Sequence, residues 1–315
     1  MANGSRHGLF AVKETTYGVT PVDPVFDTVR ITGTTLGLTK EGLQSDEIRA
    51  DRQIADYRLG NNQVGGDINF ELSYGSFDKF LQAVLLSGDW ETGVPIVGAA
   101  QIKTGVTRSS FTLVRHFADL AAASKPFYIY SGVEINTMSL SISPSAMVTG
   151  TFSVVGKSQT AATDLTALGT PTFDAPTTTS PMDAFTGTLL EGSEEIAVIT
   201  EITLTLENGI EPRFVVGSKD TIKPSVARAN LTGQITAYFE DSRLVDKFLN
   251  ETDSSIQFTL PDTDGNELTF VIPRIKYTGG QPDVDGEGPI TLSMPFQALY
   301  DAASENNFFI NRKPA

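Results

Sequence analysis

The chain contains no cysteine and only two histidines, His7 and His116, among its 315 residues. Thiol nucleophiles, disulfide frameworks and cysteine-ligated zinc sites are excluded, because each of them requires sulfur. A histidine-built metal site or a serine–histidine–aspartate triad would have to recruit one of these two imidazoles. Neither a Gly-x-Ser-x-Gly elbow nor a phosphate-binding Gly-x-x-x-x-Gly-Lys-Ser/Thr motif is present. We expect a protein that is not an enzyme and has no catalytic, cofactor or metal site.

Basic residues are also scarce, since 23 Lys and Arg stand against 38 Asp and Glu, for a formal net charge of -15. Affinity for nucleic acid through phosphate neutralisation needs the opposite balance, although a surface that repels DNA is compatible with it. No apolar run approaches the roughly 20 residues that span a bilayer. The N-terminus lacks the apolar region of a signal peptide. We therefore expect assembly in a cytoplasm and no membrane partner.

Turn residues are abundant, with 28 glycines and 16 prolines. Between them lie short runs in which apolar and polar residues alternate, a pattern that buries one face of a strand and leaves the other polar. Such runs predict antiparallel sheets with one covered face. They include residues 36–38, 68–72, 138–142, 152–154, 202–206 and 290–294.

Helical patterns are few, and two are clear. In residues 76–88, Ser76 is the predicted cap, an apolar face follows, and Gly88 is the predicted end. In residues 241–250, Asp241 or Ser242 is the predicted cap, and Leu244, Val245, Phe248 and Leu249 form one apolar stripe. The sequence thus predicts a mainly β fold with a small α component.

An internal repeat relates the two halves of the chain. Residues 29–38 and 197–206 match at five of ten positions with an offset of 168. The tetrapeptide Asp-Lys-Phe-Leu recurs with the same offset, and a Gly-x-Ile recurs at 167, in the pairs Asp78–Leu81 with Asp246–Leu249 and Gly66–Ile68 with Gly233–Ile235. We expect two tandem units, residues 1–157 and 189–315, which can share one sheet. Residues 158–188, rich in Thr and Pro, are predicted to be a linker or extended segment.

Residues 262–267, Asp-Thr-Asp-Gly-Asn-Glu, begin with the acidic spacing of a calcium loop. The third ligand before the glycine and the glutamate six residues after it are both missing. Apolar residues alternate on either side of this segment. A hairpin turn between two strands is therefore predicted.

A long charged segment between two predicted strands is the main candidate for an interaction site. Residues 40–58 hold five acids and four bases, interspersed with Ile48, Ile54 and Tyr57, which argue against disorder. Alternating charge suits a surface that must meet a partner in one register. The candidate residues are Asp46, Glu47, Arg49, Asp51, Arg52, Asp56 and Arg58.

At these residues the sequence resembles the tail tube (major tail) proteins of long-tailed bacteriophages. The resemblance is carried by Glu14–Gly18, by Ser45–Gln53, above all by Gly66–Leu81, and by Ile290–Tyr300, so that it extends over nearly the whole chain. It implies a β-sandwich or barrel core with a packed short helix, and together with the repeat it predicts two tandem units of this kind. It also implies a structural virion protein that self-assembles into rings, which stack into the tail tube.

The resemblance implies a set of partners as well: further copies of the chain, neighbouring rings, and the tail tip, terminator and tape measure proteins. DNA passes through such a tube as cargo that must not adhere. The family's rings usually have sixfold character, so the duplication predicts trimeric rings with pseudo-sixfold symmetry; hexameric rings are the alternative. Charged 40–58 segments would then connect successive rings.

Acidic residues on the wall of the tube would keep DNA from adhering, because its phosphates carry one negative charge per roughly 1.7 Å of axis. Asp67 and Glu71 alternate with apolar residues on the repeated strand, and Glu240 stands in the same phase in the second half. These three acids are the predicted lumen-facing residues. Other phage structural proteins, namely a head decoration or tail terminator protein, stay open, as do a carbohydrate-binding β module and a glycosidase.

Overall fold

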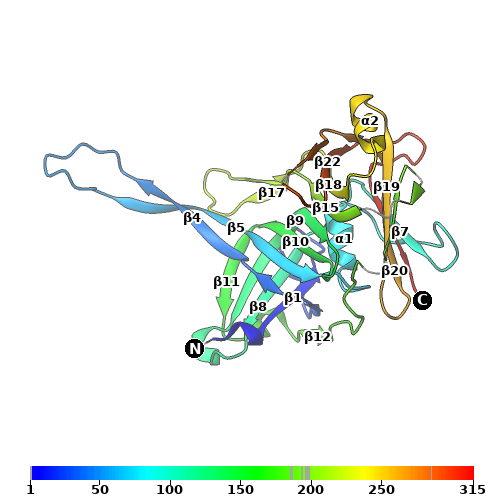
Figure 1. Ribbon diagram of the computed structural model, residues 1–315. Helices are drawn as coiled ribbons and strands as arrows, with labels where there is room; N and C mark the ends of the chain where they lie inside the picture. Colours follow the sequence, from blue (N-terminus) through cyan, green and yellow to red (C-terminus); the bar gives the residue numbers. More distant parts are fainter. Residues whose placement is uncertain (1, 185–186, 193, 196–198, 285) are drawn as a thin grey trace.

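The structure is a computed structural model and describes residues 2–184, 187–192, 194–195, 199–284 and 286–315. Within these ranges, two short α-helices accompany many strands (Figure 1). The prediction of a mainly β fold with a small α component is confirmed. The strands of the first half are β1 (His7–Lys13), β2 (Val25–Val29), β3 (Gly33–Thr34), β4 (Gly37–Gln44), β5 (Tyr57–Glu71), β6 (Glu91–Thr92), β7 (Ala100–Lys103), β8 (Phe111–Phe117), β9 (Phe127–Ile142) and β10 (Thr149–Gly156).

The remaining strands follow from residue 158 to the C-terminus. They are β11 (Ser158–Ala162), β12 (Thr172–Asp174), β13 (Thr188–Glu191), β14 (Glu194–Glu195), β15 (Ile199–Glu207), β16 (Glu211–Arg213), β17 (Ile222–Ser225), β18 (Asn230–Tyr238), β19 (Ser254–Pro261), β20 (Glu267–Tyr277), β21 (Gln281–Asp283), β22 (Thr291–Ala298) and β23 (Phe309–Lys313). Residues 197 and 198, which begin the second copy of one repeat, lie outside the described residues.

One antiparallel sheet, here called the central sheet, runs through both halves of the molecule. Its strands lie in the order β3 and β4, β5, β10, β9, β15, β18, β22 and β21. The halves meet where β9 pairs with β15, with Leu140 opposite Leu204. Figure 1 shows β10, β9, β15, β18 and β22 side by side across the middle of the molecule. The two halves therefore share one continuous sheet.

The central sheet is built from strands whose side chains alternate between two environments. On one face the apolar side chains are buried, among them Ile68, Phe152, Leu140, Leu204 and Ile235. Burial of each such side chain contributes about 1.5–3 kcal/mol. The residues between them are hydroxyl, amide and acidic side chains that stay half-buried or exposed. The predicted alternation thus sets the two faces of this sheet.

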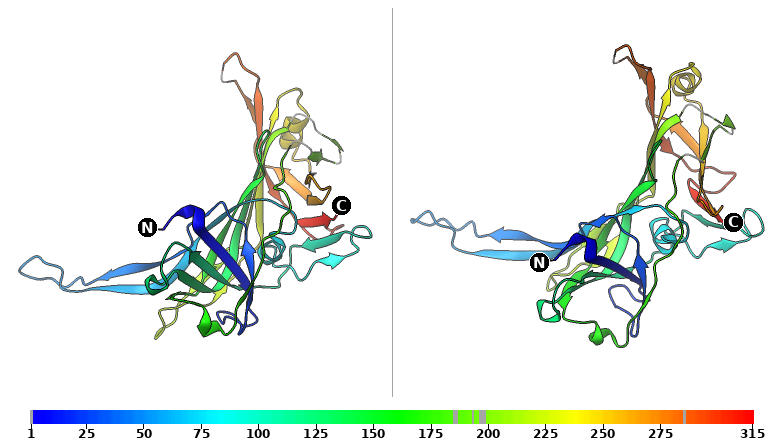
Figure 2. Two further views of the ribbon diagram at one scale, coloured as in Figure 1. Left: turned by 90° about the horizontal axis from the view of Figure 1, so that it is seen from below. Right: turned by 60° about the horizontal axis from the view of Figure 1, so that its bottom comes forward.

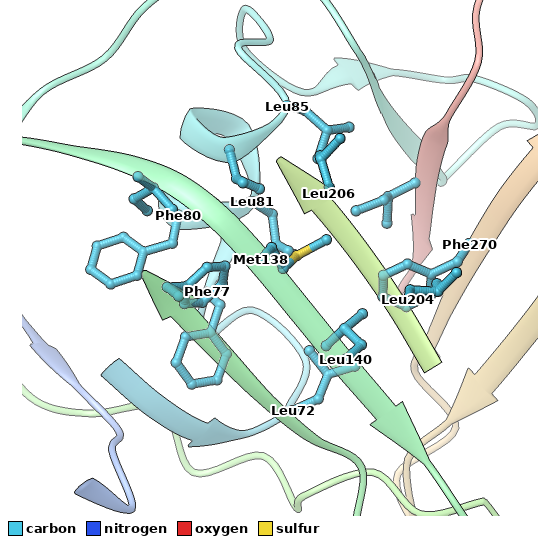
Figure 3. Packing of buried hydrophobic residues seen from close by; sticks show 14 of the residues in the cluster. Leu72, Phe77, Phe80, Leu81, Leu85, Met138, Leu140, Leu204, Leu206 and Phe270 are labelled. Carbon is cyan, nitrogen blue, oxygen red and sulfur yellow. The ribbon is translucent and has the colours of Figure 1, made fainter. Parts of the chain in front are cut away.

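Helix α1 (Asp78–Val84) lies against the apolar face of the central sheet, and its side chains are part of the main core. Phe80 and Leu81 are 4% and 1% exposed. Figure 3 shows Leu81 and Leu85 gathered with Met138 of β9 and with Leu206 of the second half. The helix therefore fills the space between the two halves rather than serving one half alone.

The predicted ends of α1 are wrong. Ser76 does not cap the helix, because its hydroxyl is hydrogen-bonded to the hydroxyls of Ser73 and Thr177. Phe77 occupies the cap position without a side-chain bond. The helix ends at Val84, well before Gly88, since the chain turns at Leu86, whose φ is positive.

Helix α2 (Arg243–Leu249) lies at the periphery of the second half (Figure 1). Ser242 occupies its cap position, and the Asp241 carboxylate accepts the Arg243 N–H at 2.9 Å. Of the predicted apolar stripe, Phe248 packs partly against the core, together with Leu244 and Val245. The last member of the stripe, Leu249, is 68% exposed.

The strand pairings of the first half recur in the second half in the same sequence. In the first half β4 pairs with β5, β5 with β10, β10 with β9, β9 with β8, and β8 with β1. In the second half β15 pairs with β18, β18 with β22, β22 with β20, β20 with β19, and β19 with β13. The strands that follow β10 and β22 also match, since β11 pairs with β9 and β23 with β20.

Two segments depart from this parallel. Residues 85–110 of the first half hold β6 and β7, whereas only four residues separate α2 from β19. Residues 158–184 run along the first half: β11 pairs with β9, β12 is parallel to β2, and Ser73 forms a bridge with Pro181. Residues 185–186 of the predicted 158–188 segment lie outside the described residues.

The predicted hairpin at residues 262–267 is present between β19 and β20. The Asp262 carboxylate accepts the backbone N–H groups of Asp264 and Asn266 at 2.9 and 2.8 Å. These bonds hold the turn and leave the carboxylate committed to it. Among the described residues, neither α1 nor α2 is long and apolar enough to cross a membrane.

Candidate functional site

The charged segment predicted as a long loop is a projecting β-hairpin, here called the arm (residues 40–62). Strands β4 and β5 continue into it, with Gln44 opposite Tyr57, and residues 45–56 form its tip. Figures 1 and 2 show the arm extending away from the body in every view. The sequence predicted shorter strands here. An apolar alternation is seen only where a strand covers the core, whereas the backbone pairing of β4 and β5 continues beyond the core into the arm.

The predicted interaction residues all lie on this arm and are exposed. Asp46, Glu47, Arg49, Asp51, Arg52 and Asp56 are in the tip, and Arg58 is at the start of β5. Two ion pairs order them, Arg49 with Asp51 at 2.8 Å and Arg58 with Asp56 at 2.9 Å. The hydrogen bond from Arg49 lowers the pKa of the Asp51 carboxyl below its usual range. The tip therefore presents fixed charges of both signs.

Apolar side chains on the arm are exposed to an unusual extent. Ile48 is 99% exposed, Ile54 62%, Tyr57 60% and Leu43 57%. An isolated hairpin cannot bury these side chains, since it has no second layer. A cluster of exposed apolar side chains rimmed by charges is typical of a protein–protein contact surface. The arm combines both components.

The second half has a segment in the same topological position, residues 208–229, between β15 and β18. It folds back onto the first half instead of projecting. The Lys219 carbonyl accepts the Asn62 N–H at 2.8 Å, and the Lys219 ammonium donates to the Leu59 carbonyl at 3.0 Å. The Asn62 side chain also donates to Asp220. This segment therefore supports the base of the arm, at Leu59 and Asn62.

The polar face of the central sheet is the second candidate surface. Residues opposite one another form a row across six strands: Asn69, Thr151, Ser139, Thr205, Thr232 and Gln297. A neighbouring row contains Glu71, Thr149, Ser141, Thr203, Gln234 and Pro295. Both rows cross the junction of the halves and include no lysine or arginine. The face is a sheet of hydroxyl and amide groups, and its charged members in β5 and β15 are acids: Asp67, Glu71, Glu201 and Glu207.

The three predicted acids lie differently with respect to this face. Asp67 and Glu71 are on it, in β5, and both are half-buried. The Asp67 carboxylate accepts a hydrogen bond from the Ser153 hydroxyl at 2.6 Å. Glu240 lies beyond the end of β18, where it lines a surface hollow with Tyr238 and Arg243. The hydroxyl rows were missed, although the alternating Ser and Thr of residues 138–142 and 202–206 carried the signal.

Comparison with known protein families agrees with this geometry. The family model described as phage tail tube protein matches residues 4–298, which is nearly the entire chain.

The chain belongs to the phage tail tube protein family.

None of the curated proteins gives a match. Membership makes this chain a bacteriophage structural protein of the virion tail. The family is structural, and its members assemble with copies of themselves and with other tail components. The family resemblance inferred from the sequence is thereby confirmed.

Residues 14–18, the first segment that carries the family resemblance, have a structural role. Glu14 is 7% exposed, and its carboxylate accepts four hydrogen bonds. The donors are the N–H groups of Gly18 and Gly132, at 2.7 and 2.8 Å, and the hydroxyls of Ser110 and Thr112, at 2.6 and 2.8 Å. A buried carboxylate is tolerated when donors surround it in this way. Glu14 thus fixes the end of β1 to β8 and β9.

Two further buried carboxylates are tied to cations. Glu134, 2% exposed, forms an ion pair with Arg108, which also donates to the Pro224 carbonyl of the second half at 2.7 Å. Burial raises the pKa of the Glu134 carboxyl, and the bond from Arg108 opposes that rise. This pair links the halves of the tail tube chain.

The other buried carboxylate, Glu191, is 3% exposed and accepts bonds from Lys247 at 2.6 Å, from Ser254 at 2.5 Å and from Tyr277 at 2.9 Å. Burial, and then the charge of Glu191, raise the pKa of the Tyr277 hydroxyl. Glu191 fastens α2 to β13, β19 and β20. Its role in the tail tube chain is therefore to hold the second half together.

The two histidines lie on neighbouring strands among aromatic rings. His116 stacks on Phe127 with ring centroids 4.3 Å apart, and His7 packs edge-on against Phe117 at 5.0 Å. Burial lowers the pKa of both imidazoles, and the nearby Arg115 contributes at His7. Within the described residues, no three His, Asp or Glu side chains are placed to hold a metal ion.

Proposed function

We propose that this protein is a ring-forming subunit whose rings stack into the phage tail tube, the conduit through which DNA leaves the virion. The observation that carries the proposal is the central sheet. It continues without interruption across both halves, with one face packed on the core and the other polar. A sheet of this kind closes into a tube wall when copies join edge to edge, and closure removes the exposed strand edges.

Each chain contributes two tandem tube units, residues 1–157 and 189–315, connected by residues 158–188. The support is the recurrence of the same pairing order in the two halves. Three chains then make a ring with pseudo-sixfold symmetry. Six chains per ring is the alternative, and such a ring would contain twice as many strands in its wall.

The polar face of the central sheet lines the lumen in this proposal. Its rows of Ser, Thr, Asn and Gln side chains offer DNA no fixed cations, and Asp67 and Glu71 add repulsion. Phosphate binding and its slow release depend on lysine and arginine, so a wall of hydroxyls and carboxylates lets DNA pass. Glu201 and Glu207, which continue the polar alternation of β15 and are exposed, add two further acids to this wall. Glu240, beyond the end of β18, contributes at most near the rim.

The arm connects successive rings. Its tip combines exposed Ile48 and Ile54 with charges of both signs, and such a tip can dock in one register on a neighbouring ring. The protein acts without catalysis, cofactor or metal. Assembly takes place in the host cytoplasm, where the tail tip, terminator and tape measure proteins set where the tube begins, ends and how long it grows.

Electron microscopy of the purified protein tests this function. We expect tubes of uniform diameter with three chains per layer, and isolated rings when residues 46–55 are replaced by Asn-Gly, which closes the hairpin directly. The truncated chain should unfold in urea like the wild type, because residues 46–55 are all exposed to solvent. Six chains per layer would overturn the trimeric ring. Capsid decoration, or single terminal rings without tubes, would instead identify a head decoration or terminator protein.

A further inference from the structure

The central sheet has two ends, and the strands at each end pair along one edge only. At one end, β21 pairs with β22, and at the other, β3 and β4 pair with β5. Among the described residues, no strand pairs with the outer edge of either. Open edges of this kind carry unpaired N–H and C=O groups and invite pairing with another chain.

The repeat relates these two open edges to the internal junction between β9 and β15. In the first half Thr34 lies opposite Ile68, and in the second half Ile202 lies opposite Ile235, the repeat partner of Ile68. Thr34 therefore corresponds to Ile202, 168 residues later. The same comparison at Val64 and Leu231 gives Leu38 and Leu206, with the same offset.

The other edge corresponds in the same way. Ser141 lies opposite Thr149 in the first half, and Asp283 lies opposite Thr291 in the second. The offset is 142 for both pairs, and it recurs further along, where Ile135 opposite Val154 corresponds to Tyr277 opposite Phe296. Residues 279–284 are thus the second-half copy of residues 137–142, the part of β9 that pairs with β15.

We infer that residues 279–284 of one copy of this chain pair antiparallel with residues 34–39 of the next copy, in the register of the internal β9–β15 junction, so that Gln281 lies opposite Gly37. This inference rests on the proposed ring and names its contact. The register follows from the internal pairs Ile142 with Ile202, Ser139 with Thr205 and Thr137 with Glu207. Transferred by the two offsets, they become Val284 with Thr34, Gln281 with Gly37 and Gly279 with Thr39.

The exposure of apolar side chains supports a second copy as the partner. Val284 is 69% exposed, whereas its counterpart at the internal junction, Ile142, is 7% exposed. Leu249 of α2 is 68% exposed, whereas its counterpart Leu81 of α1 is 1% exposed. Both counterparts are buried where the halves meet. The open end of the second half therefore exposes the residues that the internal junction covers.

At one position of the inferred pairing, both edges lack a free backbone group that would form a regular hydrogen bond. Pro282, which has no N–H, would face Leu36 in this register. The Leu36 carbonyl is already occupied, because it accepts hydrogen bonds from Arg115 at 2.5 Å and from Tyr130 at 3.2 Å. A missing donor thus meets an acceptor that is not available. The Leu36 N–H is occupied too, because it donates to the Thr34 hydroxyl at 3.1 Å, so this position adds no backbone hydrogen bond to the pairing.

A polar contact at the end of α1 also has a counterpart at the end of α2 in the inferred pairing. At the internal junction the Asn208 side chain donates to the Val84 carbonyl, at the end of α1, at 2.7 Å. The residue 168 positions before Asn208 is Lys40, which is exposed. In the inferred contact Lys40 of the next copy reaches the end of α2, where a cation is favoured by the helix dipole. The contact is head to tail, the type of contact that the proposed ring requires.

Engineered disulfides test the register, because the wild-type chain has no cysteine that could interfere. Residues directly opposite in an antiparallel pair have Cα atoms about 4.5–5.5 Å apart, within disulfide range. We expect oxidised tubes of the double variant Gln281→Cys, Gly37→Cys to give covalent dimers and trimers on a non-reducing gel. The variant Ser139→Cys, Thr205→Cys is the positive control, since the internal pair should close within one chain.

The matched negative control is Gln281→Cys with Leu38→Cys, whose side chain points to the other face of the strand; it should give no cross-link. A second pair, Gly279→Cys with Thr39→Cys, tests the same register should the first variant fail to assemble. Tubes without cross-links for both pairs would overturn the inferred register while leaving the proposed tube intact. Absence of tubes from the wild-type chain would refute the proposed function instead.

Assembly of a surface variant gives a second measurement. Leu249→Asp with Val284→Asp should leave the urea unfolding of the unassembled chain unchanged, because both side chains are exposed there. The same variant should form no rings, since two carboxylates would be buried at the contact. Rings and tubes like those of the wild type would show that this end of the second half meets no partner, and would overturn the inference.

Discussion

The tetrapeptide Asp-Lys-Phe-Leu occurs in both helices, and the two copies have different environments. In α1, residues 78–81, Phe80 and Leu81 are buried. In α2, residues 246–249, Phe248 is only partly buried and Leu249 is exposed. The local sequence is identical and both copies are helical. The environment of each copy is therefore determined by what lies beside it.

The neighbour of α1 is the second half of the same chain. Arg312 of β23 forms an ion pair with Asp78 and lies over the Trp90 ring, and Asn208 binds the end of the helix. Strand β23 also pairs with β7 beside it. Helix α2 is held by its own half, chiefly through Lys247 and Glu191. Helix α1 is thus covered by the other half of the chain, whereas α2 is held by its own half.

The largest expected effect is the difference in stability between alanine variants of Phe80 in α1 and Phe248 in α2. Phe80→Ala should lower the free energy of unfolding of the unassembled chain by about 3–5 kcal/mol, because it leaves a cavity beside Phe111 and Phe152. Phe248→Ala should cost about 1–2 kcal/mol, since less apolar area is lost. Urea unfolding at a concentration that prevents assembly measures both. Equal losses would mean that α2 is as well covered in the single chain as α1.

A smaller effect concerns the two lysines of the tetrapeptide, and here the residue in α2 should matter more for stability than the residue in α1. Lys247 is the cation for the buried Glu191, so Lys247→Met should cost about 2–3 kcal/mol, somewhat less than the removal of a partner from a fully buried pair. Lys79 pairs with Asp27 at the surface, and Lys79→Met should cost about 0–1 kcal/mol. The same unfolding experiment compares them. A larger loss at Lys79 would contradict the roles that we assign to the two ion pairs.

The smallest effect on stability concerns the polar face, where the halves should behave alike. Asp67 and Glu71 of the first half correspond to Gln234 and Tyr238 of the second. Replacing either pair by lysines should leave tubes intact and slow the ejection of DNA, because lysines bind phosphates. Ejection can be timed by the fluorescence of a DNA dye outside the virion. Slowing by the first-half pair alone would show that the two halves do not line the same wall.

The control for this prediction places the same charges elsewhere. Asp89 and Glu91 are exposed and lie in the segment between α1 and β7, away from the central sheet. Asp89→Lys with Glu91→Lys changes the net charge as much as the Asp67 and Glu71 variant does. It should leave the ejection rate unchanged. Slow ejection here would mean that net charge, and not the position of the lysines, controls passage.

Much of the fold could be predicted because its periodicities are local. Alternation at residues 138–142 and 202–206 predicted strands, and apolar faces behind cap residues in 76–88 and 241–250 predicted two helices. The ends of α1 could not be predicted, because Ser76 bonds to Ser73 and Thr177, and Thr177 is about a hundred residues away in the chain. A cap preference of about 1 kcal/mol yields to such tertiary contacts.

The candidate site was predicted in part. The mixed charges of residues 40–58 marked the arm correctly as the exposed feature, but not its form as a paired hairpin. The placement of Asp67 and Glu71 on the polar face of β5 followed from alternation. Glu240 kept the same phase in the sequence, yet β18 ends at Tyr238. Periodicity predicts the side of a strand but not the residue at which the strand ends.

The sequence by itself determined the chemistry of this protein: no thiols, few imidazoles, a surplus of acids, alternating strands and an internal repeat. These properties depend only on residue types and their spacing along the chain. Tertiary structure decided which copy of the repeat is covered, because burial depends on contacts between residues far apart in sequence. Leu81 and Leu249 are the same residue in the same tetrapeptide, yet Leu81 packs with Met138 of β9 and Leu206 of β15 (Figure 3), whereas Leu249 is exposed.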